Sequence, residues 1–126
     1  MSTYFLIPCM IFFHILDDYK LQAGVLAMLK QRSYWEKEAP DRMYRYDYLM
    51  ALAMHSLSWG FMIMLPIAIY DGFHVGMEYV VAFIVNAAIH FVVDDLKANR
   101  YKINLIVDQC IHLVQILVTA VLFIVR

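Results

Sequence analysis

The sequence predicts an all-α integral membrane protein, built as a four-helix bundle, and three observations support this fold class. The chain has 126 residues, of which 63% are hydrophobic, whereas soluble domains are nearer to half apolar. Its mean hydropathy is +0.64. Four apolar stretches reach the length of about 20 residues that a helix needs to cross the hydrocarbon core of a bilayer. The excess of apolar side chains therefore predicts contact with lipid.

The four expected spans follow one another in a single transmembrane domain that covers residues 1–126. We expect them at residues 3–21, 48–70, 77–96 and 103–125. The helix of the first span can extend as far as Leu29 before a loop at residues 30–47. No repeat, low-complexity stretch or change in composition indicates a second domain.

Positive charge is distributed unevenly among the connections between these spans. Five Lys or Arg residues lie between the first and second spans and three between the third and fourth, whereas the connection DGFHVGME has none. Basic connections remain in the cytoplasm. We therefore expect both termini outside and both basic loops inside, in the inner membrane of a bacterial cell.

Polar residues interrupt the apolar spans with a repeated spacing. Three spans contain a histidine and an aspartate four residues apart: His14 and Asp18, His90 and Asp94, and Asp108 and His112 in the reverse order. Residues four apart share one helix face. Because the fourth span runs opposite to the first and third, the reversal places every histidine deeper in the membrane and every aspartate nearer the cytoplasm.

The second span adds His55 at nearly the same depth, given a rise of about 1.5 Å per residue. The sequence thus predicts a layer of four histidines with a layer of three aspartates one turn toward the cytoplasm. Ionisable groups within a bilayer are costly and usually face the bundle interior. Imidazole and carboxylate groups together suit a divalent cation. We therefore predict a metal site, with zinc as the first candidate and manganese or iron as alternatives.

The predicted ligands share this layered position, and the aspartates are also candidates for a catalytic general base. The metal-ligand candidates are His14, His55, His90, His112, Asp18, Asp94 and Asp108, and the catalytic candidates are Asp18, Asp94 and Asp108. Seven side chains cannot all bind one ion, so some aspartates are expected to orient a histidine instead. A structural network of hydrogen bonds and a proton relay are alternative interpretations of the same pattern.

Three ionisable residues near the layer are expected to lie outside it. Asp17 and Asp95 are one position off the shared helix faces, so we expect them to face water or to pair with Lys20 and Lys97. His74 belongs to the outer connection beside two glycines, so it is not expected among the ligands.

The motifs resemble a family of small bacterial and phage membrane proteins that is known only as a domain of unknown function. The resemblance covers the four spans and rests on His14-x3-Asp18-Tyr19-x-Leu21-Gln22, His55, His90-x3-Asp94-x2-Lys97 and Asp108-Gln109-x2-His112. The family commonly has Phe after the first aspartate, where this chain has Tyr19. A looser similarity is to membrane-bound metal-dependent hydrolases, which also place His and Asp pairs in helices. The resemblance implies that these residues form one functional site, but it indicates no substrate.

Three functions are compatible with this pattern. The first is a membrane-embedded metal-dependent hydrolase that uses an aspartate as general base and acts on a lipid-like or phosphate-bearing substrate near Lys97, Arg100 and Lys102. The second is a transporter or channel for a metal ion, protons or a small solute, which would require a homo-oligomer. The third is a non-enzymatic membrane partner that binds another protein through residues 31–46. A net charge of -1 gives no general attraction to nucleic acid.

Overall fold

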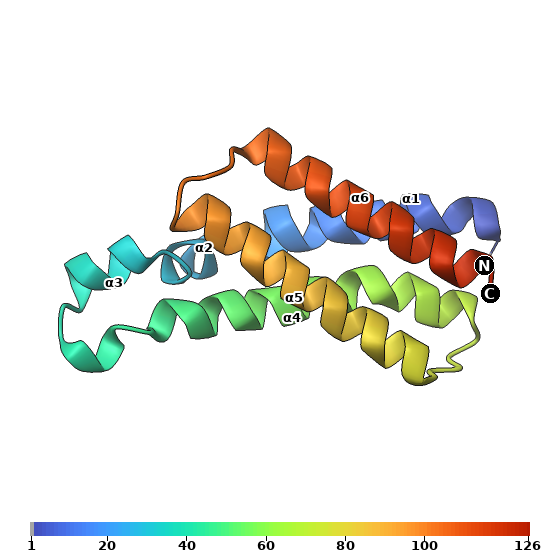
Figure 1. Ribbon diagram of the computed structural model, residues 1–126, viewed down its shortest axis with the longest axis horizontal. Coiled ribbons are helices and arrows are strands. Elements are labelled where there is room, and N and C mark those ends of the chain that lie inside the picture. The colour runs from blue at the N-terminus through green and yellow to red at the C-terminus, as the bar shows by residue number, and fades with distance from the viewer. Residues whose placement is uncertain (1) are drawn as a thin grey trace.

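The computed structural model describes residues 2–126, and all regular structure within that range is helical. In chain order the elements are α1 (Thr3–Leu16), the π-helix η1 (Asp17–Leu21), α2 (Val25–Leu29), α3 (Arg32–Glu38), the 3-10 helix η2 (Arg42–Tyr44), α4 (Asp47–Tyr70), α5 (Met77–Ala98) and α6 (Leu105–Ile124). The all-α prediction is confirmed. The long helices α1, α4, α5 and α6 pack against one another, while α2 and α3 form a small group at one end (Figure 1).

Within residues 2–126, three helices are long and apolar enough to cross a membrane: the segment Arg42–Tyr70 that contains α4, and the helices Met77–Ala98 and Leu105–Ile124. The first apolar stretch is a 14-residue α-helix followed directly by the five-residue π-helix. The expected continuation of this helix to Leu29 is wrong. The chain turns at Gly24, whose φ of 78° lies in the left-handed region that favours glycine.

The connections lie at two opposite ends of the molecule. Both termini and the α4–α5 turn are at one end, and the two basic connections are at the other (Figure 1). Thr3 Oγ1 lies 3.3 Å from the Tyr70 hydroxyl, and the Arg126 guanidinium donates to Asp71 and Glu78. The two basic connections therefore lie on the same side of the molecule, as expected from the positions of Lys and Arg in the sequence.

The half of the core nearest the termini is apolar. Its buried cluster consists of Leu6, Met10, Trp59, Ile63, Met64, Ile67, Ile116, Ala120 and Phe123. Large apolar side chains also cover the outside of the long helices, and Phe12, Val92 and Val118 are each more than half exposed. An apolar exterior around an apolar core suggests contact with lipid.

Helices α4 and α5 approach closely at Gly60. A Cβ atom at this position would lie 3.3 Å from both the Ala87 Cβ and the Phe83 ring, which is tighter than ordinary contact. The absence of a side chain therefore permits the close approach of the two backbones. This contact lies one to two turns from His55 on α4 and one turn from His90 on α5, so it sets the separation of these histidines.

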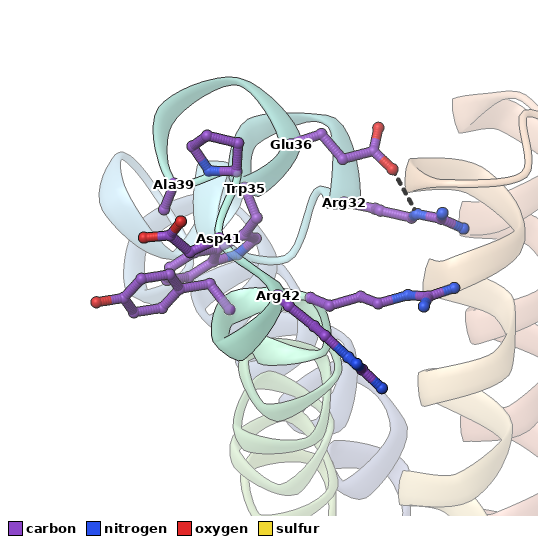
Figure 2. A pocket seen from close by; sticks show the side chains of 9 residues that line it. Arg32, Trp35, Glu36, Ala39, Asp41 and Arg42 are labelled. Atoms are coloured by element: carbon purple, nitrogen blue, oxygen red, sulfur yellow. Dashed lines mark hydrogen bonds and ion pairs between the residues drawn. The ribbon is translucent and has the colours of Figure 1, made fainter.

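The basic connection between α1 and α4 is folded into a compact hairpin of α3 and η2. The rings of Trp35 and Tyr44 stack with centroids 6.2 Å apart, and the Trp35 indole donates to the Leu29 carbonyl at 2.7 Å. Arg32 and Arg42 extend toward the same side of the hairpin, whereas Asp41 points the other way (Figure 2). The hairpin thus presents Arg32 and Arg42 on one face at the basic end of the molecule, where Arg32 is paired with Glu36 at 2.7 Å (Figure 2).

Candidate metal centre

Four histidines meet in the interior, one from each long helix. His14, His55, His90 and His112 are each at most 2% exposed. The Nε2 atoms of His55 and His90 are 3.0 Å apart. The His112 ring centroid lies 4.2 Å from that of His90 and 5.8 Å from that of His14. His74 is exposed in the α4–α5 turn, outside the cluster, as expected.

Asp18 lies beside this group of histidines. Its Oδ1 atom is 3.6 Å from His55 Nε2 and 4.0 Å from His90 Nε2. One ligand atom from each of Asp18, His55 and His90 falls within 4.8 Å of the others, so the three side chains could hold a metal ion. The i,i+4 partner His14 is close to Asp18, but the 3.6 Å separation of Nδ1 and Oδ2 is too long for a hydrogen bond.

The other two predicted aspartates are bound by lysines. Asp94 Oδ2 accepts from Lys30 Nζ at 2.6 Å, and its Oδ1 lies 3.1 Å from Lys97 Nζ. Lys97 also donates to Asp108 Oδ2 at 2.7 Å. No periodic pattern around Lys30, in the basic connection, indicated that its side chain would be buried. Because both Asp94 oxygens contact ammonium groups, Asp94 is the least available of the three predicted aspartates.

Asp17 belongs to the interior, contrary to the prediction. Its side chain is 1% exposed, its Oδ1 accepts from the Ser58 hydroxyl at 2.6 Å, and its Oδ2 is 3.5 Å from His55 Nδ1. The expected pairing with Lys20 is therefore wrong. A π-helix turns less per residue than an α-helix, so at the start of η1 the adjacent side chains of Asp17 and Asp18 both point inward. Sequence periodicity assumes a regular α-helix and cannot detect this.

Asp95 also differs from its expected role. It accepts from Arg100 at 2.8 Å and from the Asn99 amide at 2.9 Å, while the expected partner Lys97 contacts Asp94 and Asp108. Asp95 is therefore buried at the end of α5, where its partners are Asn99 and Arg100 and not the histidines. Hereafter the His/Asp cluster means His14, His55, His90, His112, Asp17, Asp18, Asp94 and Asp108.

Hydrogen bonds determine which His14 nitrogen carries the proton. The Trp59 indole, which can only donate, bonds to His14 Nδ1 at 2.8 Å. Neutral His14 must therefore carry its proton on Nε2, which donates to Gln109 Oε1 at 3.1 Å. The Gln109 amide nitrogen then donates to Oδ2 of both Asp18 and Asp108, at 3.1 and 3.0 Å. Both His14 nitrogens are engaged, so His14 contacts the carboxylates through Gln109.

Five buried side-chain atoms have no hydrogen-bond partner within residues 2–126, and all belong to the His/Asp cluster. They are Asp17 Oδ2, Asp18 Oδ1, His90 Nδ1, Asp108 Oδ1 and His112 Nε2. An unsatisfied buried polar group costs about 1–3 kcal/mol. Carboxylate oxygens and imidazole nitrogens are the atoms that bind divalent transition metals. The donor set therefore fits such an ion.

The charges of the buried groups support the same conclusion. Four carboxylates, from Asp17, Asp18, Asp94 and Asp108, face two ammonium groups, from Lys30 and Lys97. With neutral histidines, two negative charges remain uncompensated in the interior. A single divalent cation would balance them.

The fold and the site together define a helical protein that has three helices capable of crossing a membrane and a buried His/Asp cluster. The family model described as "Protein of unknown function (DUF3307)" matches residues 5–126. The chain therefore belongs to this family of unknown function. No curated protein and no solved structure matches the chain.

The buried ion pair of Lys30 and Asp94 gives a first prediction. Lys30→Met leaves Asp94 with only Lys97, and breaking a buried pair costs about 3–5 kcal/mol. We expect a clearly lower midpoint of thermal unfolding in detergent, measured by circular dichroism. Adding Asp94→Asn to this variant should restore part of the loss. Lys37→Met, at a side chain that is 82% exposed, serves as the control. An unchanged midpoint for Lys30→Met would contradict the pairing.

Proposed function

We propose that the chain is a four-helix integral membrane protein that holds a divalent cation in the His/Asp cluster and acts as a metal-dependent hydrolase. The observation that carries this proposal is the location of the unpartnered buried atoms. Those found within residues 2–126 all belong to one cluster that has two uncompensated negative charges. A cation would supply the missing charge and a partner for Asp18 Oδ1, and it would replace the hydrogen bond between the Nε2 atoms of His55 and His90.

Asp18, His55 and His90 are the proposed ligands. Two nitrogen ligands on one zinc ion lie about 3.3 Å apart when both bonds are about 2.0–2.1 Å in tetrahedral geometry. The 3.0 Å between the two Nε2 atoms is close to that distance, and the distances to Asp18 Oδ1 are 3.6 and 4.0 Å. Asp17 faces Nδ1 of His55, the nitrogen that is not a proposed ligand. A carboxylate in this position commonly orients the ligand histidine. Zinc is the first candidate, with manganese or iron as alternatives.

The same geometry supports hydrolysis. Three protein ligands leave a coordination position open, as in catalytic sites, and a divalent cation there would supply Lewis-acid activation of a water molecule. Asp108 Oδ1 is a carboxylate oxygen without a partner, so it is available to accept a proton. Asp94 is held by two lysines and is the weaker candidate for that role.

The position of Lys97 supports a phosphate-bearing, lipid-like substrate. Its side chain is 25% exposed and ends between Asp94 and Asp108 at the basic end of the molecule. An anionic group that entered from the headgroup layer would meet this ammonium first. Arg100 and Lys102, the other cations predicted for this role, lie on the same connection, where Arg100 is paired with Asp95.

Membrane placement follows from the charge and hydropathy of the elements. We place α4, α5 and α6 across the bilayer, with α1 and η1 as the fourth span. The hairpin of α3 and η2, with its arginines on one side, would then lie at the cytoplasmic surface (Figure 2). Both termini would face outward, and the membrane would be the inner membrane of a bacterial cell.

Transport and a purely structural role have less support. A transport path through one chain would have to cross the apolar half of the core, where Trp59, Ile63 and Met64 are fully buried. A structural network of hydrogen bonds would not leave buried carboxylate and imidazole atoms without partners. The cationic hairpin remains a candidate surface for another protein, independent of the cluster.

Metal content tests the proposal directly. Protein purified in detergent and dialysed against zinc should retain the ion at no less than one equivalent per chain, measured by elemental analysis. His55→Ala should lower the affinity at least tenfold, because it removes a ligand. His74→Ala is the matched control, since His74 is exposed in the α4–α5 turn. A parent protein that stays empty with zinc, manganese and iron would refute the metal centre.

Hydrolysis is tested separately with the metal-loaded protein. We expect phosphate release from micelles of phosphatidic acid that stops on chelation and returns when the metal is restored. Asp108→Asn should reduce turnover at least 100-fold, because it removes the proposed proton acceptor. Lys102→Met, at an exposed cation of the same basic connection, should mainly raise KM. A metal-loaded protein that releases no phosphate would contradict this substrate class while leaving the metal centre in place.

Orientation in the membrane gives a fourth prediction. Cys9 and Cys110 are first replaced by Ala, and single cysteines are then introduced by Lys37→Cys and Val75→Cys. A membrane-impermeant maleimide should label residue 75 on intact bacterial spheroplasts and residue 37 only after lysis, because α3 is expected in the cytoplasm. The reverse pattern would contradict the proposed orientation.

A further inference from the structure

Asp108 and His112 form a second set of unpartnered atoms in the cluster. The two residues lie one turn apart on α6, and both are fully buried. Asp108 Oδ1 and His112 Nε2 face each other at 3.4 Å, and neither atom has a hydrogen-bond partner. Neither residue is in the set of Asp18, His55 and His90 to which the first ion is assigned.

Hydrogen bonds from α5 fix the protonation of His112. The Asn86 amide nitrogen donates to the Ala82 carbonyl, an obligatory acceptor, at 3.0 Å and to Thr119 at 2.9 Å. Asn86 Oδ1 and the Asn86 carbonyl therefore face the Gln115 amide nitrogen, at 3.3 and 3.2 Å. Gln115 Oε1 must then accept, and it lies 2.9 Å from His112 Nδ1. Nδ1 carries the proton, so in neutral His112 the Nε2 atom presents a lone pair.

The lone pair of His112 Nε2 thus faces a carboxylate oxygen. Other groups in contact with this carboxylate bind its opposite oxygen: the Lys97 ammonium at 2.7 Å and the Gln109 amide at 3.0 Å both lie on Asp108 Oδ2. Two facing acceptors repel each other unless a proton, which would make an ion pair of His112 and Asp108, or a metal cation lies between them. Their 3.4 Å separation matches the spacing of about 3.3 Å expected of two ligands on one ion.

We propose that Asp108 Oδ1 and His112 Nε2 hold a second divalent cation beside the first, so that the His/Asp cluster is a two-metal centre. The first ion balances the two negative charges of the cluster, so the charge of the second would be balanced by an anion bound with the ions, either hydroxide or the phosphate of the substrate. This inference rests on the proposed function and extends it. Asp108 then acts as a ligand instead of as a free proton acceptor, and Gln115 acts as the group that orients His112.

Gln109 connects the two positions. Its amide nitrogen bonds Oδ2 of Asp18 at 3.1 Å and Oδ2 of Asp108 at 3.0 Å. In each of these carboxylates Oδ2 is hydrogen-bonded and Oδ1 is free. The free Oδ1 of Asp18 faces His55 and His90, and the free Oδ1 of Asp108 faces His112. Two-metal centres serve the hydrolysis and transfer of phosphate esters. The second position therefore favours the phosphate-bearing substrate class.

The test counts ions in the complete protein in detergent by equilibrium dialysis with Mn²⁺, and examines the bound ions by electron paramagnetic resonance. We expect two ions per chain and the signal of a coupled pair of Mn²⁺ ions. His112→Ala should bind one ion and show an uncoupled signal.

A milder variant keeps the test decisive if His112→Ala does not fold. Gln115→Leu retains the His112 ligand but removes the acceptor that sets its tautomer, so we expect the second ion to bind 10- to 100-fold more weakly. Gln31→Leu, on the exposed connection, is the matched control and should still bind two ions.

The outcomes separate this inference from the proposed function. A parent protein that binds one Mn²⁺, unaffected by His112→Ala or Gln115→Leu, would overturn the second position and leave the first in place. A single ion lost in His112→Ala but retained in His55→Ala would overturn both the two-metal centre and the ligand set proposed for the first ion. A parent that binds none would overturn both proposals.

Discussion

The burial of four carboxylates among apolar helices is the constraint on which the structure depends. Moving a charge out of water costs several kcal/mol even after relaxation, and Asp17, Asp18, Asp94 and Asp108 all lie inside. Each has a dedicated partner: a serine for Asp17, lysines for Asp94 and Asp108, and a glutamine shared by Asp18 and Asp108. These four partners, Ser58, Lys30, Lys97 and Gln109, come from four different segments of the chain, so the compensation of charge holds distant segments together.

The same constraint explains the fold of the basic end. Lys30 reaches Asp94 only because the chain turns at Gly24 and α2 returns against α4. Asn99, just after α5, binds the backbone of the first basic connection. Its amide nitrogen donates to the Lys30 carbonyl, and its Oδ1 accepts from the Arg32 backbone N–H. The first basic connection, the end of α5 and the buried charges therefore form one cooperative unit. Lys30 therefore has a structural role in this unit, because its ammonium group compensates the buried Asp94 carboxylate.

The sequence was sufficient where the chemistry follows regular helical geometry. The i,i+4 spacing and the alternation of helix direction placed His14, His55, His90 and His112 in one cluster, and the structure has them there. The sequence was insufficient where the position of a side chain depends on an irregular backbone or on a folded loop. Asp17 is directed inward at a π-helix, and Lys30 enters from a connection with no periodic pattern. The bond from Trp59 to His14 depends on the packing of α1 against α4, which composition does not reveal.

The distribution of satisfied and free oxygens distinguishes a metal centre from a structural network or a proton relay. Both oxygens of Asp94 contact ammonium groups. This is the arrangement expected of a buried carboxylate whose negative charge is balanced and which has no other role. Asp18 and Asp108 each have Oδ2 bound and Oδ1 free, with the free atom toward imidazole nitrogens. A relay would need a continuous series of hydrogen bonds, but Gln115 Oε1 accepts the proton of His112 Nδ1, so the series ends at the His112 Nε2 lone pair, which faces Asp108 Oδ1. Lone pairs that converge from several helices onto the same space are the arrangement that a cation requires.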